Sequence, residues 1–176
     1  FAKAKGCLIT DLNGKQYIDM SMMGIGTNIL GYGNKKIDRA VKNTIQKGNL
    51  STLNCPEEVY LAEKLIQLHP WAEMVKFTRS GGEANAVAIR IARASTKKQK
   101  IAVCGYHGWH DWYLAANLTS KDRLDEHFIK GISTRGVPNE LTGSTYTFRY
   151  NNFEELESLI RNNPEIGIIK MEVARN

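Results

Sequence analysis

The sequence predicts an α/β fold, in which a mostly parallel sheet is flanked by helices and preceded by an N-terminal β-hairpin. Residues 74–78 have the composition of a strand, a glycine turn follows, residues 83–94 have a helical pattern, and residues 100–104 form a second apolar run. A strand–helix–strand succession is a βαβ unit, and such a unit requires a parallel sheet. Residues 167–172 predict one more buried strand.

The first fifty residues predict the hairpin and one helix. Residues 7–10 and 16–19 lie on either side of Asn13-Gly14, a pair that favours a hairpin turn because both residues tolerate positive φ. After a glycine-rich stretch, apolar residues recur at helical spacing until Gly48, at Ile37, Ala40, Val41 and Ile45. The expected organisation is a hairpin-and-helix segment over residues 1–50, followed by residues 51–176.

Two further helices are indicated by their first turns. Pro56 precedes two glutamates, which suits a helix start because proline gives up no needed hydrogen bond there and carboxylates favour the positive end of the dipole. Its predicted buried stripe is Val59, Ala62, Leu65 and Ile66. Asn152 is the expected cap of a helix that carries Phe153, Leu156, Leu159 and Ile160. In residues 119–145 the apolar residues recur with neither helical nor strand spacing.

Composition excludes several classes of protein. The net charge of +6 comes from dispersed Lys and Arg without a block of like charges, which favours a solvated surface over a nucleic-acid partner. No apolar run approaches the roughly 20 residues of a membrane span. Cys7, Cys55 and Cys104 fit neither a disulfide framework nor a metal pattern, so we expect reduced thiols and a cytoplasmic protein. The chain has no initiator Met, and we expect truncation.

One candidate site is the segment Ser80-Gly81-Gly82, which lies between a predicted strand and a predicted helix. Free backbone N–H groups and the helix dipole favour an anion at such a place. The two glycines also fit a tight turn without a ligand. The segment matches neither the mononucleotide nor the dinucleotide glycine fingerprint, so it points to a different phosphorylated ligand.

A second candidate is the aromatic run from Tyr106 to Tyr113, which follows the strand at residues 100–104. Open parallel sheets place ligands at this end of their strands, where an aromatic ring can stack on a flat cofactor and a histidine can assist proton transfer or hydrogen bonding. The alternative for Trp109, Trp112 and Tyr113 is packing or an interface. A zinc site at His107, His110 and Asp111 is disfavoured because the ligand set is unconvincing, and we predict no metal.

Together these segments resemble the class III aminotransferases, and the glutamate-1-semialdehyde aminomutase branch is the most similar. The resemblance covers nearly the whole chain in family order, through residues 11–19, 30–33, 75–94, 106–108 and 168–173. It implies part of the large domain of a fold-type I transferase that depends on pyridoxal 5'-phosphate (PLP). It also implies a homodimer that acts on small-molecule amino donors and acceptors, with neither a nucleic acid nor a membrane as partner.

The resemblance also assigns residues. It places the cofactor phosphate at Ser80, Gly81 and Gly82, although Gly82 stands where the family has a hydroxyl residue. Tyr106 is placed against the pyridine ring with His107 beside it. Glu172 matches the acidic residue of the family's Glu-Pro-Val motif, with valine in place of the proline at the next position.

The family's Schiff-base lysine and the carboxylate that pairs with the pyridine nitrogen follow the Glu-Pro-Val motif, and the chain ends at Asn176. Transamination needs both groups. We therefore expect an aminotransferase or aminomutase whose 176-residue part is inactive alone, with catalytic residues that cannot be assigned here. The alternative is a non-catalytic PLP-binding, phosphate-binding or interaction module of the same fold.

Overall fold

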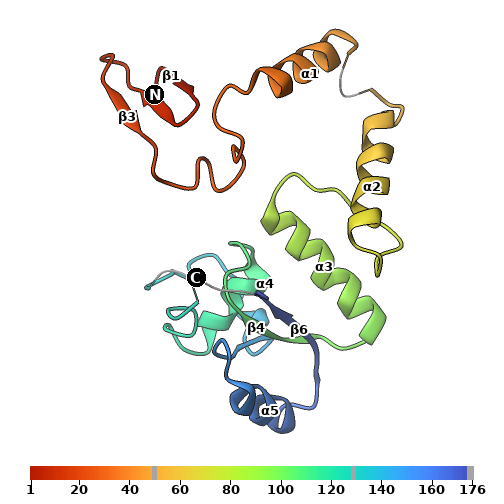
Figure 1. The fold of residues 1–176 in the computed structure, drawn as a ribbon. Helices are drawn as coiled ribbons and strands as arrows, with labels where there is room; N and C mark the ends of the chain where they lie inside the picture. The colour runs from red at the N-terminus through yellow and green to blue at the C-terminus, as the bar shows by residue number, and fades with distance from the viewer. Residues whose placement is uncertain (49–50, 128–129, 174–176) are drawn as a thin grey trace. The chain divides into compact units, whose positions relative to one another are not determined.

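The computed structural model describes residues 1–48, 51–127 and 130–173. The chain forms two compact units, Phe1–Met74 and Val75–Asn176 (Figure 1). The organisation expected from the sequence divides the chain after residue 50, which itself lies outside the described residues. That division stays a prediction about domains.

The first unit begins with a three-stranded antiparallel sheet in the order β1-β2-β3, made of β1 (Lys3–Lys5), β2 (Leu8–Thr10) and β3 (Gln16–Ile18). The predicted hairpin is confirmed as β2 and β3. In its turn, Asp11 Oδ1 accepts hydrogen bonds from the N–H groups of Asn13 (2.9 Å) and Lys15 (3.0 Å), and Gly14 has a φ of +85°. The sequence did not predict β1 as a separate strand.

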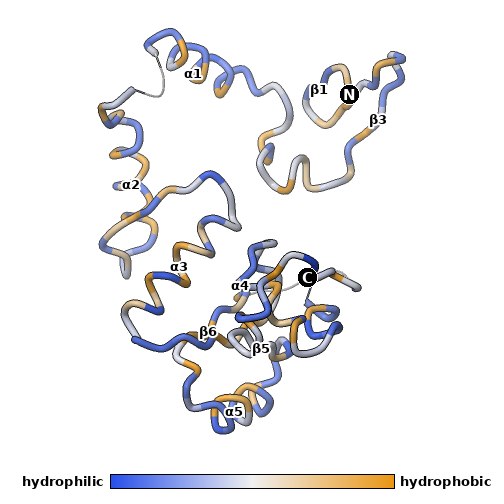
Figure 2. The backbone as a smooth tube through the Cα atoms, turned by 180° about the vertical axis from the view of Figure 1, so that it is seen from behind, coloured by the Kyte–Doolittle hydropathy of each residue, from blue (hydrophilic) through white to orange (hydrophobic). Residues whose placement is uncertain are grey.

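Two helices complete the first unit, α1 (Lys35–Gln46) and α2 (Pro56–Leu68). Both were predicted, and Pro56 is the first residue of α2 as expected. The predicted α2 stripe is only partly buried in this structure: Ala62, Leu65 and Ile66 are half-buried, whereas Val59 is 51% exposed and no residue of α2 is fully buried. Figure 2 shows apolar and polar residues interleaved along both helices. An apolar stripe predicts which face of a helix will pack against another element. It does not determine whether such an element is present.

The second unit contains the predicted parallel sheet, in the order β5-β4-β6. Its strands are β4 (Lys100–Cys104), β5 (Thr145–Thr147) and β6 (Ile166–Met171). The predicted strand at residues 74–78 is wrong, because this segment has no strand structure. A strand is stabilised by the ladder that it shares with a neighbour, and no described strand pairs with these residues.

Helices cover both faces of this sheet. They are α3 (Gly81–Thr96) and the short α4 (Asp111–Leu114) on one side, with α5 (Phe153–Asn162) on the other (Figure 1). The buried residues of β4 alternate accordingly. Ile101 and Val103 pack in a cluster with Ile89 of α3 and residues of α4, whereas Ala102 and Cys104 pack in a second cluster near α5. The strand period of two therefore builds two small cores.

A register shift in β6 lets that strand contribute to both cores. Lys100 pairs with Ile166 and the next residue, Ile101, pairs with Ile168, so Gly167 is the extra residue on β6. Such an irregularity changes the face to which neighbouring side chains point. As a result Ile166 lies in the α5 cluster and Ile168 in the α3 cluster.

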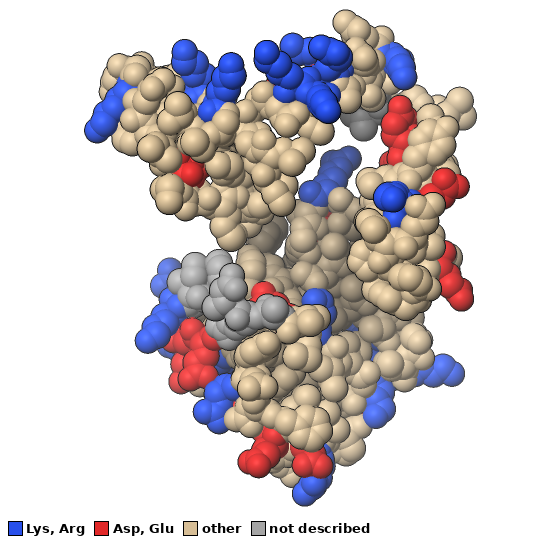
Figure 3. Space-filling model, viewed as in Figure 1, with Lys and Arg blue, Asp and Glu red and all other residues tan. Residues whose placement is uncertain are grey.

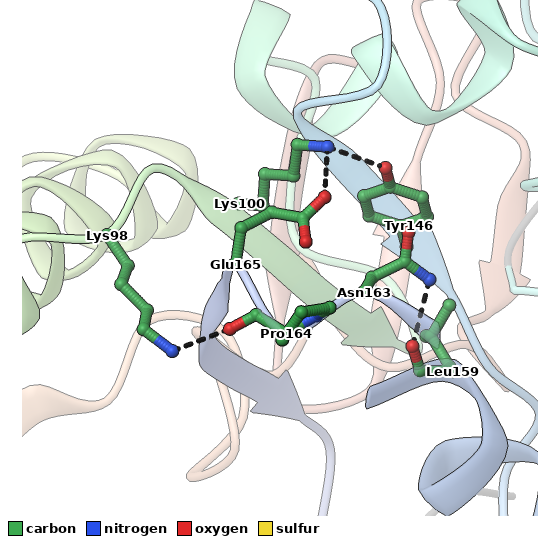
Figure 4. A network of polar contacts seen from close by, with 7 residues as sticks. All are labelled: Lys98, Lys100, Tyr146, Leu159, Asn163, Pro164 and Glu165. Carbon is green, nitrogen blue, oxygen red and sulfur yellow. Dashed lines mark hydrogen bonds and ion pairs between the residues drawn. The ribbon is translucent and has the colours of Figure 1, made fainter. Parts of the chain in front are cut away.

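Polar contacts tie together the segments at the amino ends of β4 and β6 (Figure 4). Lys100 Nζ donates to Glu165 Oε1 at 2.5 Å and to the Tyr146 hydroxyl at 3.1 Å. Lys98 Nζ donates to the Pro164 carbonyl at 2.7 Å. These contacts anchor one end of the sheet, and the candidate site lies at the other end.

The surface matches the dispersed charge expected from the sequence. On the face of the second unit visible in Figure 3, basic and acidic side chains are interspersed. None of the helices in the described ranges combines the length and apolar character needed to cross a membrane. Cys7, Cys55 and Cys104 are all free thiols.

Candidate functional site

The N-terminus of α3 is formed by a reciprocal capping arrangement. Ser80 Oγ accepts a hydrogen bond from the Glu83 N–H at 3.2 Å, and Glu83 Oε2 accepts one from the Arg79 N–H at 2.8 Å. The N–H groups of Gly81 and Gly82 belong to the first turn, where a helix offers no internal acceptor. They point out of the positive end of the helix dipole, which makes them donors for an anion.

The two glycines differ in their surroundings. A Cβ added at Gly81 would meet nothing within 4 Å, so the backbone is open to a ligand there. A Cβ added at Gly82 would lie 2.8 Å from His110 Cε1 and 2.9 Å from His110 Nδ1. A Cβ at Gly108, which has a φ of +98°, would lie 3.0 Å from the Gly82 Cα. The loop after β4 therefore closes over Gly82 and leaves Gly81 open.

His107 holds this loop against the sheet. Its side chain is buried, and Nε2 lies 2.9 Å from the Cys104 carbonyl, which can only accept, so Nε2 carries the proton. Asn85 Nδ2 of α3 donates to the His107 carbonyl at 3.2 Å. Burial lowers the pKa of the His107 imidazole below its ordinary value, and the positive charge of Lys170 lowers it further. His107 is therefore a neutral hydrogen-bond donor to the backbone.

Tyr106 and Glu172 lie at the carboxyl ends of β4 and β6. The Tyr106 ring is 38% exposed and packs edge-on against Tyr113, with ring centroids 6.1 Å apart. The Tyr113 hydroxyl donates to the Gly105 carbonyl at 2.9 Å, which fixes the residue next to Tyr106. The Glu172 side chain lies against Gly105, where an added Cβ would be 2.4 Å from Oε2.

The six residues predicted from the sequence therefore fall into two groups. Ser80, Gly81 and Gly82 form the helix N-terminus, and the loop carrying Tyr106 and His107 packs against it through Gly108. Glu172 joins this loop at Gly105. Their assignment to a cofactor stays a prediction.

Sequence reasoning assigned no supporting role at this site to several residues that the structure places there. Asn85 and His110 contact the loop and Gly82, and His127 Nδ1 accepts a hydrogen bond from the Gly105 N–H at 3.1 Å. His127 lies in the stretch that has no period, so no local signal pointed to it. Of the aromatic run, Trp112 and Tyr113 are buried as the packing alternative expects, whereas Trp109 is 70% exposed.

The absence of a metal stays a prediction. Within residues 1–48, 51–127 and 130–173, no three His, Cys, Asp or Glu side chains are arranged to hold a metal ion.

Comparison with known proteins identifies the class of enzyme to which this fold belongs. A solved transaminase with PLP bound superposes with a TM-score of 0.82 at 27% sequence identity, over 98% of this chain and 40% of that one. The fold is thus that of fold-type I PLP-dependent transaminases. The aminotransferase class-III family model matches residues 1–166.

This chain belongs to the class-III aminotransferase family, as the resemblance implied. The 3-aminobutyryl-CoA aminotransferase of Cloacimonas acidaminovorans is 36% identical over 172 residues, which are 96% of this chain and 37% of that protein. The glutamate-1-semialdehyde 2,1-aminomutase of Desulfovibrio desulfuricans is 38% identical over 179 residues, with 99% and 41% covered. The chain spans about two fifths of the length of these relatives.

Proposed function

We propose that the full-length protein is a PLP-dependent aminotransferase or aminomutase that holds the cofactor phosphate at the N-terminus of α3. The observation that carries this proposal is the open backbone at Gly81, where first-turn N–H donors lie beside the loop that bears Tyr106. A phosphate needs several donors and close backbone approach, and glycine permits both. Family membership supports the same choice of cofactor.

Each site residue has a distinct role in this proposal. The N–H groups of Gly81 and Gly82 and the hydroxyl of Ser80 bind the phosphate, and the ring of Tyr106 lies against the pyridine ring. His107 and Glu172 position the loop, since they contact Cys104 and Gly105 at its start. When bound, PLP supplies the electron sink through which an amino group is moved.

The proposed substrates are small-molecule amino donors and acceptors. Both an aminotransferase and an aminomutase are among the relatives, so we keep transfer between substrates and isomerisation within one substrate as the two reaction types. We propose that the 176-residue chain alone is inactive, because no residue in it matches the family's Schiff-base lysine.

We further propose that the full-length protein is a homodimer. The first unit carries large apolar side chains that are more than half exposed, among them Ile37, Val41 and Ile45 along one face of α1. Contiguous exposed apolar surface is typical of an interaction site. Sedimentation of the full-length protein at twice the mass of its chain supports the proposal, and sedimentation as a monomer contradicts it.

A cytoplasmic location is also part of the proposal. Its support is that Cys7 and Cys55 are exposed free thiols and Cys104 is a buried one. Unpaired thiols persist in a reducing compartment. Fractionation of the source cells tests this directly, and recovery outside the cytoplasm would contradict it.

The deciding experiment is intact mass analysis of the natural gene product with PLP, before and after borohydride reduction. We expect a reduced cofactor adduct on one lysine outside residues 1–176, released by excess amino donor added before reduction. An unmodified protein would contradict PLP chemistry and favour the non-catalytic binding module.

A further inference from the structure

We propose that His110 Nδ1 is a phosphate-binding donor that takes the place of a side-chain hydroxyl at position 82. This inference rests on the proposed function, since it assigns a further residue to the same cofactor phosphate. Three observations carry it: the position of the ring at Gly82, the unsatisfied nitrogen, and the hydrogen bonds and ring contact at His110.

The ring of His110 fills the space that a side chain on Gly82 would occupy. The ideal Cβ position of Gly82 lies 2.9 Å from Nδ1 and 2.8 Å from Cε1 of His110. These distances are shorter than real Cβ contacts, so a serine or threonine at position 82 would have to displace the ring. The imidazole thus stands beside the first-turn N–H groups of α3, where a hydroxyl donor would otherwise stand.

Nδ1 of His110 has no hydrogen-bond partner in the part of the chain that the structure describes, and the atom itself is buried. A buried polar atom without a partner has lost its hydrogen bonds to water without replacing them, so such atoms are rare in folded proteins. A phosphate oxygen at the α3 N-terminus is a strong acceptor and satisfies Nδ1 when this nitrogen carries the proton. Binding therefore selects the Nδ1–H form of the ring.

The backbone holds the ring in this place before any ligand binds. The His110 carbonyl accepts hydrogen bonds from the N–H groups of Tyr113 (2.9 Å) and Leu114 (3.1 Å), which begin α4. The ring stacks on Trp109 with centroids 4.7 Å apart and planes 22° apart. A donor that is already oriented loses little conformational entropy on binding.

The phosphate contribution can be isolated by comparing PLP with pyridoxal, which lacks the phosphate. Full-length apo protein is titrated with each compound, and the ratio of the two dissociation constants reports phosphate contacts alone. For His110→Phe we expect PLP binding weaker by about ten- to a hundredfold, the range for hydrogen bonds to charged groups, with pyridoxal binding unchanged. His110→Asn places an amide N–H near the Nδ1 position and should restore most of the ratio.

A double variant tests the replacement itself and covers the case in which His110→Phe fails to fold. His110→Ala frees the space at Gly82, and Gly82→Ser in that background restores a hydroxyl. We expect the double variant to prefer PLP over pyridoxal more strongly than His110→Ala does. His69→Phe is the matched control, because His69 also contacts a tryptophan ring, Trp71, but lies in the first unit.

The outcomes separate this inference from the proposed function. If the wild-type protein binds no PLP, both fail. If it binds PLP and His110→Phe leaves the PLP-to-pyridoxal ratio unchanged, or weakens both compounds equally, only the role of His110 is overturned. A PLP-to-pyridoxal ratio of dissociation constants that rises in His110→Phe and returns toward the wild-type value in His110→Asn supports it.

Discussion

Gly105 directly follows β4 in a backbone conformation that other residues rarely adopt, with a φ of +93°, and it lies against the Glu172 side chain. A Cβ there would approach Oε2, Cδ and Cγ of Glu172 at 2.4, 2.6 and 2.8 Å, so the whole side chain would have to move. We predict that Gly105→Ala lowers the free energy of unfolding by about 3 kcal/mol through backbone strain and displacement of Glu172. Urea unfolding of the full-length protein measures this.

Gly136→Ala is the matched control for that prediction. Gly136 has a similar φ of +87°, and an added Cβ would meet nothing within 4 Å. Its expected cost is about 1–2 kcal/mol from strain alone. If Gly105→Ala and Gly136→Ala lower the free energy of unfolding equally, contact with Glu172 makes no contribution to the loss.

His107 links stability to pH. Because burial lowers the pKa of its imidazole, the unfolded chain binds a proton more readily than the folded chain below pH 6.5, the ordinary value. Stability rises with pH wherever the unfolded state binds more protons, so the folded protein loses stability as pH falls through this window, by up to about 1.4 kcal/mol per pH unit.

His107→Gln should remove this dependence while keeping a donor for the Cys104 carbonyl. We therefore predict a smaller change in urea midpoint between pH 7.5 and pH 5.5 for His107→Gln than for wild type. Identical changes in the two proteins would mean that His107 does not titrate as its burial requires.

At the scale of elements, helix capping gives a prediction with an internal comparison. Asn152 Oδ1 caps α5 by accepting the Glu155 N–H at 3.0 Å, and Ser80 caps α3 in the same way. We predict that Asn152→Ala and Ser80→Ala each cost about 1 kcal/mol of stability. Only Ser80→Ala should also weaken PLP binding. Equal PLP affinity in the two variants would remove Ser80 from the phosphate site.

The helices and strands also show which parts of the secondary structure local sequence can predict. The pattern predicted α3, α5 and β4 because caps, helical spacing and an apolar run are local signals. Residues 74–78 have a strand-like composition too, yet they form no strand, since pairing depends on a neighbour and not on composition. Short β5 gave no signal above its irregular surroundings.

At the scale of the whole molecule, burial differs sharply between the two units. Every buried apolar residue that the structure describes lies in Val75–Asn176, and Thr10 is the only described residue of Phe1–Met74 that is buried. We predict that limited trypsin digestion of the 176-residue chain degrades the first unit and leaves a protected fragment from the second. Mass spectrometry identifies the fragments, and longer survival of residues 1–74 would contradict the prediction.

The sequence by itself determined the family, most helices, the hairpin and the glycine segment at the α3 N-terminus, because these depend on residues close together in the chain. Only the tertiary structure decided that His110 fills the side-chain space of Gly82 and that Glu172 lies against Gly105. Both contacts join residues far apart in sequence, and their geometry follows from how β4, β6 and α3 pack. Local propensity carries no information about such distances.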